Sequence, residues 1–497
     1  MNIVELFIAQ ARKSPHKEAL VENNKSITYS SLYTSVKETA NYFKSKDVNQ
    51  GDKVLIAIPM SIDTYRVVLA LLYLGAIPVF MEEWAFKNNF YDNAKILDCK
   101  AVIVARRFRI IALLSKAIRQ IPIKLSLSKL GNTDSELCSL KPNTPALYSF
   151  TSGSSGEAKI AVRSHAFLKE QFRILSEVTN SKGDENVCCG LAVVVLFYLG
   201  QGNTIVLRTK KLQNNAVLLN SILNKFEVNQ IVDSPAKLLH YSTQITAESA
   251  SEITDIYTGG GPVFPDDAEN LNSVFFNAKC TVIYGSTEVE PISVVNTNQI
   301  IEANNNHEQG LCVGKVSDNL SLKIITLETS QDVIFNPEDF QNKWLQDEEI
   351  GEVVVMGSHV LDSYYKSQDI FKKQKIKVEG NLWHKTGDSG YIKDDLLYLT
   401  GSCHSLIKKG DRLISPFIFE NKVRQITGVN KGTIIENNGK LTVVLESSIS
   451  AASLEPQLKK IINYDAVLIL KSIPMDVRHL TKINYYELKT LLKRTVN

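Results

Sequence analysis

Short apolar runs that alternate with helical segments are the feature that most restricts how this chain folds. Val54–Pro59, Ile77–Phe80 and Ala101–Ala105 are runs of strand type, and Asp63–Leu74 has the apolar spacing of a helix. A basic stretch, Arg106–Gln120, follows as a predicted helix. Because strands that are joined through helices usually lie parallel, this order predicts a parallel sheet covered by helices.

A second series of strand and helix patterns runs from Phe150 to about Ser293, which predicts further parallel pairing. After Gly310 the pattern changes to short strands such as Leu320–Ile325 and Glu352–Met356, which are typical of an antiparallel, distorted β-barrel. The expected fold class is therefore α/β. We expect a large, multi-lobed N-terminal domain with parallel βα sheets plus the distorted barrel.

A turn at Thr400–Gly401 is expected to introduce a second unit. Residues 401–497 are predicted to form a small, mobile α+β domain, and residues 1–400 the large domain. The small unit carries 15 Lys and Arg against 8 Asp and Glu, a net +7, and the remainder carries 41 against 45, a net −4. A basic unit facing a mildly acidic one suits a polyanionic ligand between them, although a solvated basic face explains the charge equally well.

The composition excludes several classes of protein. Hydrophobic residues make up 44% and charged residues 22%, which is typical of a globular chain, and the net charge of +3 gives no reason to expect nucleic acid binding. The seven cysteines form no CxxC pair, so a reducing, cytoplasmic location is expected. No apolar run approaches the roughly 20 residues of a membrane span. Met1–Lys17 has the pattern of an amphipathic helix rather than a signal peptide.

Thr151–Lys159 reads Thr-Ser-Gly-Ser-Ser-Gly-Glu-Ala-Lys and directly follows the apolar run Ala146–Phe150. Glycine and small hydroxyl residues let a backbone approach phosphates closely, and their N–H and hydroxyl groups donate to phosphate oxygens. The segment is not a Walker loop, because Lys159 lies three residues beyond Gly156. Alone, it could equally be a flexible serine–glycine loop.

Four further segments make a ligand site the better interpretation. Tyr284-Gly285-Ser286-Thr287-Glu288 follows a strand-like run, so a hydroxyl and a carboxylate stand at the end of a strand, where α/β sheets bind ligands. Gly259-Gly260-Gly261 lies upstream as a bare backbone surface suited to a flat base. Trp383-His384-Lys385-Thr386-Gly387-Asp388 and the segment around Lys482 complete the set.

These five segments, in this order and spacing, resemble the superfamily of adenylate-forming enzymes: acyl-CoA synthetases, nonribosomal peptide adenylation domains and firefly-type luciferases. The resemblance extends over essentially the whole chain, including Ile27–Leu32 near its start, Gly51–Val54, Leu74–Val79 and Gly351–Val355. The large domain would then bind AMP and the acyl group. Members of this superfamily use ATP and Mg²⁺ to join AMP to a carboxylic acid.

The resemblance implies a role for each matching residue. The phosphate loop would handle the β- and γ-phosphates through Thr151, Ser152, Gly153, Ser154, Ser155, Gly156 and Lys159. The nucleotide would further contact Gly259, Gly260, Gly261, Tyr284, Gly285 and Ser286, with the three glycines and Tyr284 beside the adenine. Asp388 would accept the ribose hydroxyls.

The catalytic residues would be Lys482, Thr287 and Glu288. Thr287 would bond the α-phosphate, Glu288 would hold Mg²⁺, and Lys482 would bridge the α-phosphate and the substrate carboxylate. Attack of one anion on another depends on positioning and on cations more than on acid–base chemistry, so this set is chemically coherent.

The chain departs from the family pattern at the start of the small unit. Where the family carries an arginine that contacts ribose and phosphate, this chain has Ser402, and His404 occupies the following hinge position. A charge-assisted hydrogen bond contributes about 1.5–3 kcal/mol, so ATP use is expected to suffer unless another cation compensates. Lys408 and Arg412 are the candidates for that contact.

The acid is expected to be a fatty or other apolar acid, because Cys188–Gly202 is apolar and lacks the histidine with which many acyl-CoA synthetases gate the acid. CoA is the expected acceptor. Alternatives are a separate carrier protein, since no carrier domain follows Lys482, or closure of a β-hydroxy acid to a β-lactone. A second alternative is a catalytically weakened relative that binds nucleotide or acyl groups.

Overall fold

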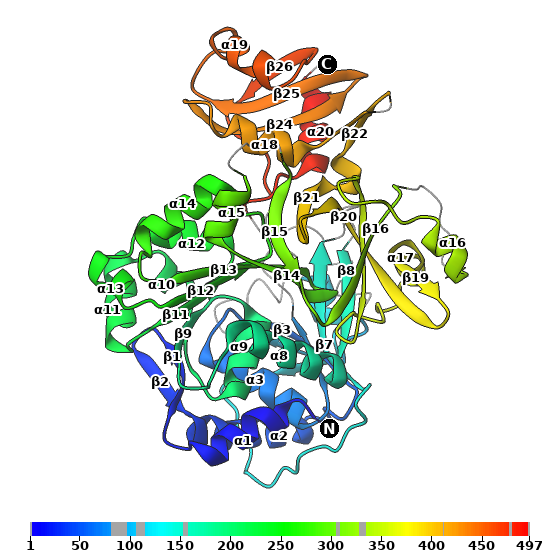
Figure 1. Cartoon of the computed structure of the whole chain (residues 1–497). Helices are drawn as coiled ribbons and strands as arrows, with labels where there is room; N and C mark the ends of the chain where they lie inside the picture. Colours follow the sequence, from blue (N-terminus) through cyan, green and yellow to red (C-terminus); the bar gives the residue numbers. More distant parts are fainter. Residues whose placement is uncertain are drawn as a thin grey trace.

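The computed structural model describes residues 2–80, 97–105, 115–152, 158–304, 309–327, 334–410, 412–476 and 480–495. These residues form two large sheets with helices on and between them, and a smaller group of elements at the C-terminal end (Figure 1). The α/β class predicted from the sequence is confirmed.

A six-stranded sheet in the order β6-β5-β3-β4-β7-β8 comes from the first third of the chain. Its neighbours are parallel from β6 to β7, and only β7 and β8 are antiparallel. The strands are β3 (Lys53–Ala57), β4 (Ile77–Phe80), β5 (Ala101–Val104), β6 (Ile123–Leu125), β7 (Pro145–Ser152) and β8 (Ala158–Ser164). The predicted parallel sheet is therefore confirmed. Of the predicted basic helix, α7 (Lys116–Gln120) is present, and residues 106–114 lie outside the described residues.

The second sheet has 15 strands and runs β16-β18-β20-β21-β15-β14-β13-β12-β11-β9-β10-β1-β2, with β17 and β19 paired beside β20. The run from β13 to β1 is parallel, and the strands beyond β13 on the other side are antiparallel. The bounds are β1 (Glu18–Glu22), β2 (Lys25–Thr28), β9 (Asn186–Cys189), β10 (Thr204–Leu207), β11 (Gln230–Asp233), β12 (Asp255–Gly259), β13 (Lys279–Ser286), β14 (Val289–Asn296), β15 (Leu311–Val316), β16 (Leu320–Ile325), β17 (Ile334–Phe335), β18 (Gly351–Gly357), β19 (Lys375–Val378), β20 (Asn381–Lys393) and β21 (Leu396–Ser402).

The antiparallel strands expected as a barrel are thus continuous with the parallel ones. Within the described residues, β16 is an edge strand whose only partner strand is β18, so the antiparallel strands extend one open sheet and do not close into a barrel. The physical link is the β13–β14 hairpin, which reverses the chain without interrupting the hydrogen-bonded ladder. The turn predicted at Thr400–Gly401 is wrong, because both residues lie inside β21, and Gly401 pairs with Ser389.

Helices between the two sheets bury the largest apolar core. They are α1 (Val4–Lys13), α2 (Tyr29–Ser45), α3 (Ile62–Tyr73), α8 (His165–Thr179) and α9 (Ala192–Gln201). Side chains of β9 alternate as a strand requires: Val187 and Cys189 join this core, and Cys188 faces the opposite side of the sheet. That opposite side is covered by α10 (Lys210–Gln213), α11 (Ala216–Lys225), α12 (Pro235–Ser242), α13 (Ala247–Ser251) and α14 (Pro265–Val274).

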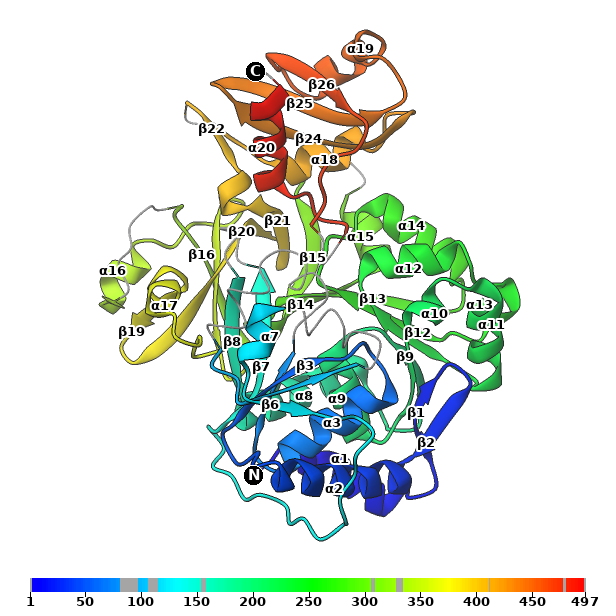
Figure 2. The ribbon, with the colours of Figure 1, turned by 180° about the vertical axis from the view of Figure 1, so that it is seen from behind.

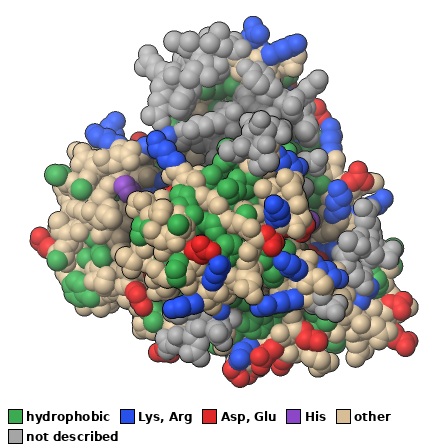
Figure 3. Space-filling view, turned by 90° about the horizontal axis from the view of Figure 1, so that it is seen from above, with side chains coloured by type: hydrophobic (Ala, Val, Ile, Leu, Met, Phe, Trp, Pro, Cys, Tyr) green, Lys and Arg blue, Asp and Glu red, His purple; other side chains and the backbone are tan. Residues whose placement is uncertain are grey.

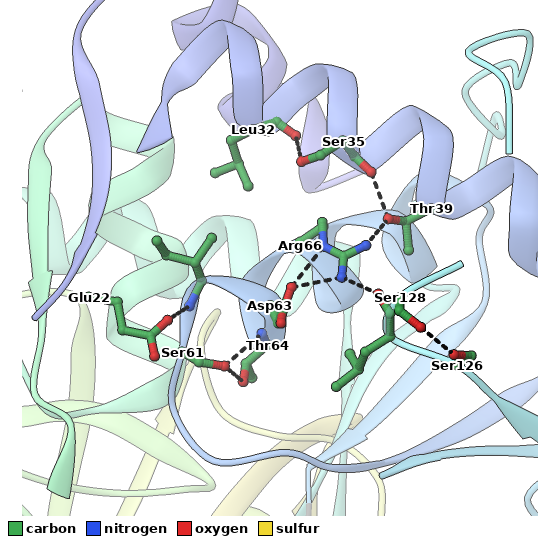
Figure 4. A network of polar contacts seen from close by, with 12 residues as sticks. Glu22, Leu32, Ser35, Thr39, Ser61, Asp63, Thr64, Arg66, Ser126 and Ser128 are labelled. Atoms are coloured by element: carbon green, nitrogen blue, oxygen red, sulfur yellow. Dashed lines mark hydrogen bonds and ion pairs between the residues drawn. The ribbon is translucent and has the colours of Figure 1, made fainter. Parts of the chain in front are cut away.

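A buried arginine ties α3 to its neighbours (Figure 4). Arg66 donates to Asp63 Oδ1 at 2.7 Å, to Thr39 Oγ1 on α2 at 2.7 Å and to the carbonyl of Leu127 at 2.8 Å. Each of these bonds satisfies a donor that burial would otherwise leave unpaired. The guanidinium therefore fixes α2, α3 and the segment after β6 against one another.

The C-terminal elements form a third sheet, β24-β25-β26, with helices on it (Figure 2). The strands are β24 (Val429–Asn437), β25 (Lys440–Ser447) and β26 (Ala466–Leu470), and the helices are α18 (Pro416–Val423), α19 (Ala451–Ile461) and α20 (Tyr485–Thr495). A hairpin of β22 (Ile407–Lys409) and β23 (Arg412–Ile414) precedes them. Other short helices are α15 (Thr297–Ala303), α16 (Pro337–Gln341), α17 (Gln368–Gln374) and the 3₁₀ turn η2 (Cys403–Ser405).

The surface shows mixed charge. On the face in Figure 3, Lys and Arg side chains lie among Asp and Glu side chains, without one large patch of a single sign in the part that is described. None of the helices formed by the described residues is long and apolar enough to cross a membrane.

One ionic contact joins the C-terminal elements to the large sheet. Arg424, which follows α18, bonds Asp266 and Asp267 in the first turn of α14, with Nη2 2.7 Å from Asp267 Oδ1. Its guanidinium also lies over the ring of Phe264, 4.8 Å from the centroid. Burial raises the pKa of Asp267 to about 6, and the charge of Arg424 acts in the opposite direction.

Arg424→Ala is expected to lower the stability of the full chain by about 2–3 kcal/mol, because a largely buried carboxylate loses its cation. Without the guanidinium, the pKa of Asp267 rises further above that of an unfolded aspartate, so the folded chain is the stronger proton binder and stability falls as pH rises. Thermal unfolding should therefore show a larger loss at about pH 8 than at about pH 5. Lys460→Ala, at an exposed lysine of α19, is the control; an equal loss at both pH values would contradict this account.

Candidate functional site

The carboxyl ends of β12 and β13 and the crossing strands β20 and β21 bring three of the predicted segments together. Gly259 ends β12 and pairs with Ile283 of β13, directly before Tyr284. On the other side, Asp388 of β20 pairs with Ser402 of β21. The hydroxyl of Tyr284 donates to Asp388 Oδ2 at 2.9 Å, which joins the two halves of the site.

The glycines provide the bare backbone surface that the sequence predicts. A Cβ at position 259 would lie 2.6 Å from the carbonyl oxygen of Ile283, so no larger residue fits there. Gly260 has a φ of +84°, a conformation that favours glycine. A flat ring could therefore approach this backbone closely.

Tyr284 and Asp388 are held by a short chain of bonds. The N–H of Asp388 donates to Thr386 Oγ1 at 3.1 Å, and Thr386 Oγ1 donates to the carbonyl of Val353 at 2.9 Å. Burial, and then the neighbouring Asp388 carboxylate, raise the pKa of the Tyr284 phenol well above its usual value, so Tyr284 stays a hydrogen-bond donor. Within the described residues no hydrogen bond reaches the other oxygen of Asp388, which could accept from a donor such as a sugar hydroxyl.

Glu288 lies in the β13–β14 hairpin and is 7% exposed. Its carboxylate Oε1 accepts from Tyr364 Oη at 3.0 Å, and its backbone oxygen accepts from the Leu361 N–H at 2.7 Å. Its own N–H donates to Ser286 Oγ at 3.2 Å, and the carbonyl of the half-buried Thr287 accepts from Arg163 at 3.4 Å. The predicted hydroxyl and carboxylate are thus adjacent, and the carboxylate is fixed by Tyr364.

The described residues contain no group of three or more His, Cys, Asp or Glu side chains that could hold a metal ion alone. Magnesium does not need such a group, because it is usually held by one or two carboxylates together with substrate phosphates and water. The fixed carboxylate of Glu288 fits that requirement. The residues present are therefore compatible with a magnesium ion that enters with a phosphate ligand.

The phosphate loop is described only at its edges. Thr151 and Ser152 end β7, and Lys159 in β8 pairs with Thr151. Gly153, Ser154, Ser155, Gly156 and Glu157 lie outside the described residues. The side chain of Lys159 is 6% exposed and lies close enough to the buried His384 to lower its pKa, after the larger effects of burial and of Lys375.

Lys482 lies at the edge of a small loop closed by a β-bridge between Met475 and Ile483. Its carbonyl accepts from the N–H of Asp476 at 2.7 Å, and its side chain is half-buried. The nearby Glu420 is buried, and burial raises its pKa to about 7 while its bonds to Tyr485 and Thr433 and the charge of Lys482 lower it. The described residues form no hydrogen bond or ion pair between Lys482 and the Thr287–Glu288 turn.

The structure also describes the segment in which Ser402 stands where the family has an arginine. Ser402 ends β21 beside Asp388, and the exposed His404 lies in the 3₁₀ turn that follows. Lys408 and Arg412 are on opposite strands of the β22–β23 hairpin, both exposed. Among the contacts of the described residues neither reaches Asp388. The contact predicted for them is with the ribose or phosphate of ATP, and it stays a prediction.

An apolar cavity opens beside the glycines, and it is lined in part by the stretch Cys188–Gly202 from which an apolar acid was predicted. It is a narrow cavity of about 20 Å³ between α8, α9 and the ends of β11, β12 and β13. The lining is formed mostly by aliphatic and aromatic side chains: Leu175, Thr179, Leu191, Val194, Phe197, Tyr198, Val232, Tyr257, Thr258, Gly259, Ile283 and Glu290. The apolar run at 190–200 was the signal in the sequence, but it could equally indicate a buried helix.

Polar groups stand at the margin of this cavity. Gln171 on α8 is buried, and its amide donates to Glu290 Oε2 at 3.3 Å. Tyr257 donates to the carbonyl of Thr179 at 3.0 Å. None of these residues was predicted as a site residue from the sequence motifs. The same is true of Tyr364, whose hydroxyl donates to Glu288. Their roles depend on contacts between distant segments rather than on a local pattern.

Comparison with known proteins agrees with this geometry. The family described as AMP-binding enzyme matches residues 7–365. The olefin beta-lactone synthetase of Stenotrophomonas maltophilia is 22% identical over 478 residues, which are 88% of this chain and 86% of that protein. The fumosorinone synthetase of Cordyceps fumosorosea is 22% identical over 411 residues, 77% of this chain, but the match spans only 10% of that protein.

Solved structures share the fold. The O-succinylbenzoate coenzyme A synthetase of Bacillus subtilis, solved with ATP and a magnesium ion, superposes with a TM-score of 0.81 at 19% identity, over 98% of this chain and 99% of the other. At that identity the likeness shows the fold alone. Together with the family match over most of the sequence, it leads to one conclusion: the chain belongs to the AMP-binding enzymes, the superfamily of adenylate-forming enzymes that its motifs predict.

Proposed function

We propose that this enzyme uses ATP and Mg²⁺ to convert a fatty or other apolar carboxylic acid into its acyl adenylate and then transfers the acyl group to CoA. The observation that carries the proposal is the apolar cavity whose lining includes Gly259 and Ile283, immediately before the Tyr284–Asp388 pair. An acid in the cavity would present its carboxylate where the nucleotide site begins. The apolar lining favours an alkyl or aryl chain over a charged one.

The proposed nucleotide contacts follow the geometry. An adenine would lie against the backbone of Gly259, Gly260 and Gly261 and beside Tyr284, and the free oxygen of Asp388 would accept a ribose hydroxyl. Tyr284 keeps that carboxylate in place through its 2.9 Å bond. The family match and the nucleotide-bound relative support this assignment.

In the chemical step, a carboxylate oxygen of the acid bonds to the α-phosphorus. The bond from that phosphorus to the oxygen bridging to the β-phosphate breaks, and pyrophosphate leaves with the electron pair. Thr287 would donate a hydrogen bond to the α-phosphate, and Lys159 and the phosphate loop would hold the β- and γ-phosphates. Lys482 would lie close to the reacting oxygens. Glu288 would hold Mg²⁺, which when bound neutralises phosphate charge.

We further propose that residues 401–497 act as a small, mobile domain on the large domain of residues 1–400. The separate core of the C-terminal elements supports this division, although β21 crosses the boundary. Movement would let Lys482 reach the Thr287–Glu288 turn for adenylation and withdraw for transfer. We place this chemistry in the cytoplasm.

A second acceptor has a specific observation in its favour. The relative from Stenotrophomonas is described as an olefin beta-lactone synthetase, and the match covers most of both chains. The adenylate of a β-hydroxy acid could close on its own hydroxyl, which releases AMP without a thiol. A separate carrier protein is the remaining alternative to CoA.

The deciding experiment measures pyrophosphate release from ATP across a panel of acids of increasing chain length, including β-hydroxy acids, with CoA present or absent. We expect release with apolar acids and Mg²⁺, and a thioester when CoA is present. Lactone formation without CoA would favour the second acceptor. No release with any acid, in a chain that still binds ATP, would refute the proposal and indicate a binding protein.

Lys482→Ala is expected to slow formation of the adenylate by at least about a hundredfold, because the cation that offsets charge in the transition state is lost. Thiolation of a supplied acyl adenylate should change much less, since that step does not join two anions. Rapid-quench assays of the two half-reactions make the comparison. Lys471→Ala, at an exposed lysine after β26, is the control, and an equal loss in both half-reactions would show that Lys482 has another role.

Val194→Trp tests the cavity directly. The larger side chain should fill the space beside α9, so the Michaelis constant for long acids should rise about tenfold or more while that for ATP stays the same. Val217→Trp makes the same change at a site that is 82% exposed and serves as the control. Unchanged use of every acid by the Val194 variant would exclude this cavity as the acyl site.

A further inference from the structure

Lys375, the first residue of β19, has a side chain that is 0% exposed. Its ammonium donates to the carbonyl oxygen of Leu361 and lies 6.0 Å from the centroid of the Tyr364 ring. Among the ion pairs of the described residues, none includes Lys375. A charged side chain buried without an ion-pair partner is costly, so packing alone does not account for a lysine at this position.

The surroundings of Lys375 point to Glu288. The backbone of Leu361 contacts both residues, because its N–H donates to the Glu288 carbonyl at 2.7 Å and its carbonyl oxygen accepts from Lys375. Tyr364 also serves both, since its hydroxyl donates to Glu288 Oε1 and its ring faces the ammonium. Burial lowers the pKa of the Lys375 ammonium to about 7, and the negative charges of Glu288 and then of Asp362 raise it.

We propose that Lys375 is a positioning residue: its ammonium, held near Glu288 by Leu361 and Tyr364, weakens the binding of a divalent cation to this carboxylate and strengthens the binding of the phosphates of ATP. The inference rests on the proposed function, in which Glu288 holds Mg²⁺. It adds to the site a basic side chain, that of Lys375, which lies outside the motif segments. Lys159, also buried near His384, supplies charge of the same sign from β8.

The reason is electrostatic. A positive charge near a carboxylate repels a metal cation that binds there, and the same charge attracts a polyphosphate, and both effects are strong where water is excluded. A metal that is held too firmly by the protein would not leave with pyrophosphate. Removing the charge should therefore move two affinities in opposite directions, whereas damage to the fold would weaken both.

The test uses the full chain and the variant Lys375→Met, which keeps the length of the side chain and removes its charge. Mn²⁺ alone binds only weakly to the single carboxylate of Glu288, so it is titrated to high concentration at about pH 6 and followed by electron paramagnetic resonance; this weak binding should tighten about tenfold in the variant. Binding of ATP in the presence of EDTA, followed by calorimetry, should weaken about tenfold. Lys377→Met, at an exposed lysine on the same strand, should change neither affinity, and Lys375→Arg should restore both.

If Lys375→Met does not fold, Lys375→Gln carries the same expectation, because its amide can still donate to the Leu361 carbonyl. Two unchanged affinities, or two that weaken together, would overturn the inference. Glu288→Gln should abolish Mn²⁺ binding in either background. If the wild-type chain releases no pyrophosphate with any acid, the proposed function fails; if it does and only the opposite shifts are missing, the role of Lys375 alone fails.

Discussion

The hydrogen bond between Tyr284 and Asp388 joins residues that are 104 positions apart in the sequence, and the arrangement of the site depends on it. Tyr284 is placed by the end of a parallel strand, and Asp388 by an antiparallel one. The bond can form only because both strands belong to one sheet, connected through β14, β15 and β21. Continuity between the parallel and antiparallel parts is therefore a requirement of the site.

Much of the fold could be predicted from local patterns. The strands at Ile77–Phe80 and Leu320–Ile325 match the prediction to the residue, and those near Val54, Ala101 and Glu352 to within about two positions, because short apolar runs between turn residues usually form strands. The joining of the antiparallel strands to the parallel sheet could not be predicted, since pairing between distant strands leaves no local signal. The same limit applies to Thr400–Gly401, where glycine indicated a turn but pairing with β20 keeps the residues in a strand.

The candidate site divides in the same way. Glu288, Asp388 and Lys482 could be found because each lies in a short motif with a chemical reason for its residue types. Lys375 could not, because it lies in the run Lys-Lys-Gln-Lys-Ile-Lys, which is typical of an exposed surface. Only the contacts of Leu361 and Tyr364, both distant in the sequence from Glu288, show that this lysine is buried beside a carboxylate.

The buried charged residues of this chain are of two kinds: those that form ion pairs and those that do not. Arg208 pairs directly with the buried Asp233, and Arg424 pairs with Asp266 and Asp267, so each of these charges is neutralised by a neighbour and left with little capacity for a ligand. Glu288 and Lys375 form no such ion pair, although both are buried and both contact Leu361 and Tyr364. Because neither group is neutralised by an ion pair with the other, each keeps the capacity to act on a ligand. A doubly charged metal and a polyphosphate would need that combination when they bind together.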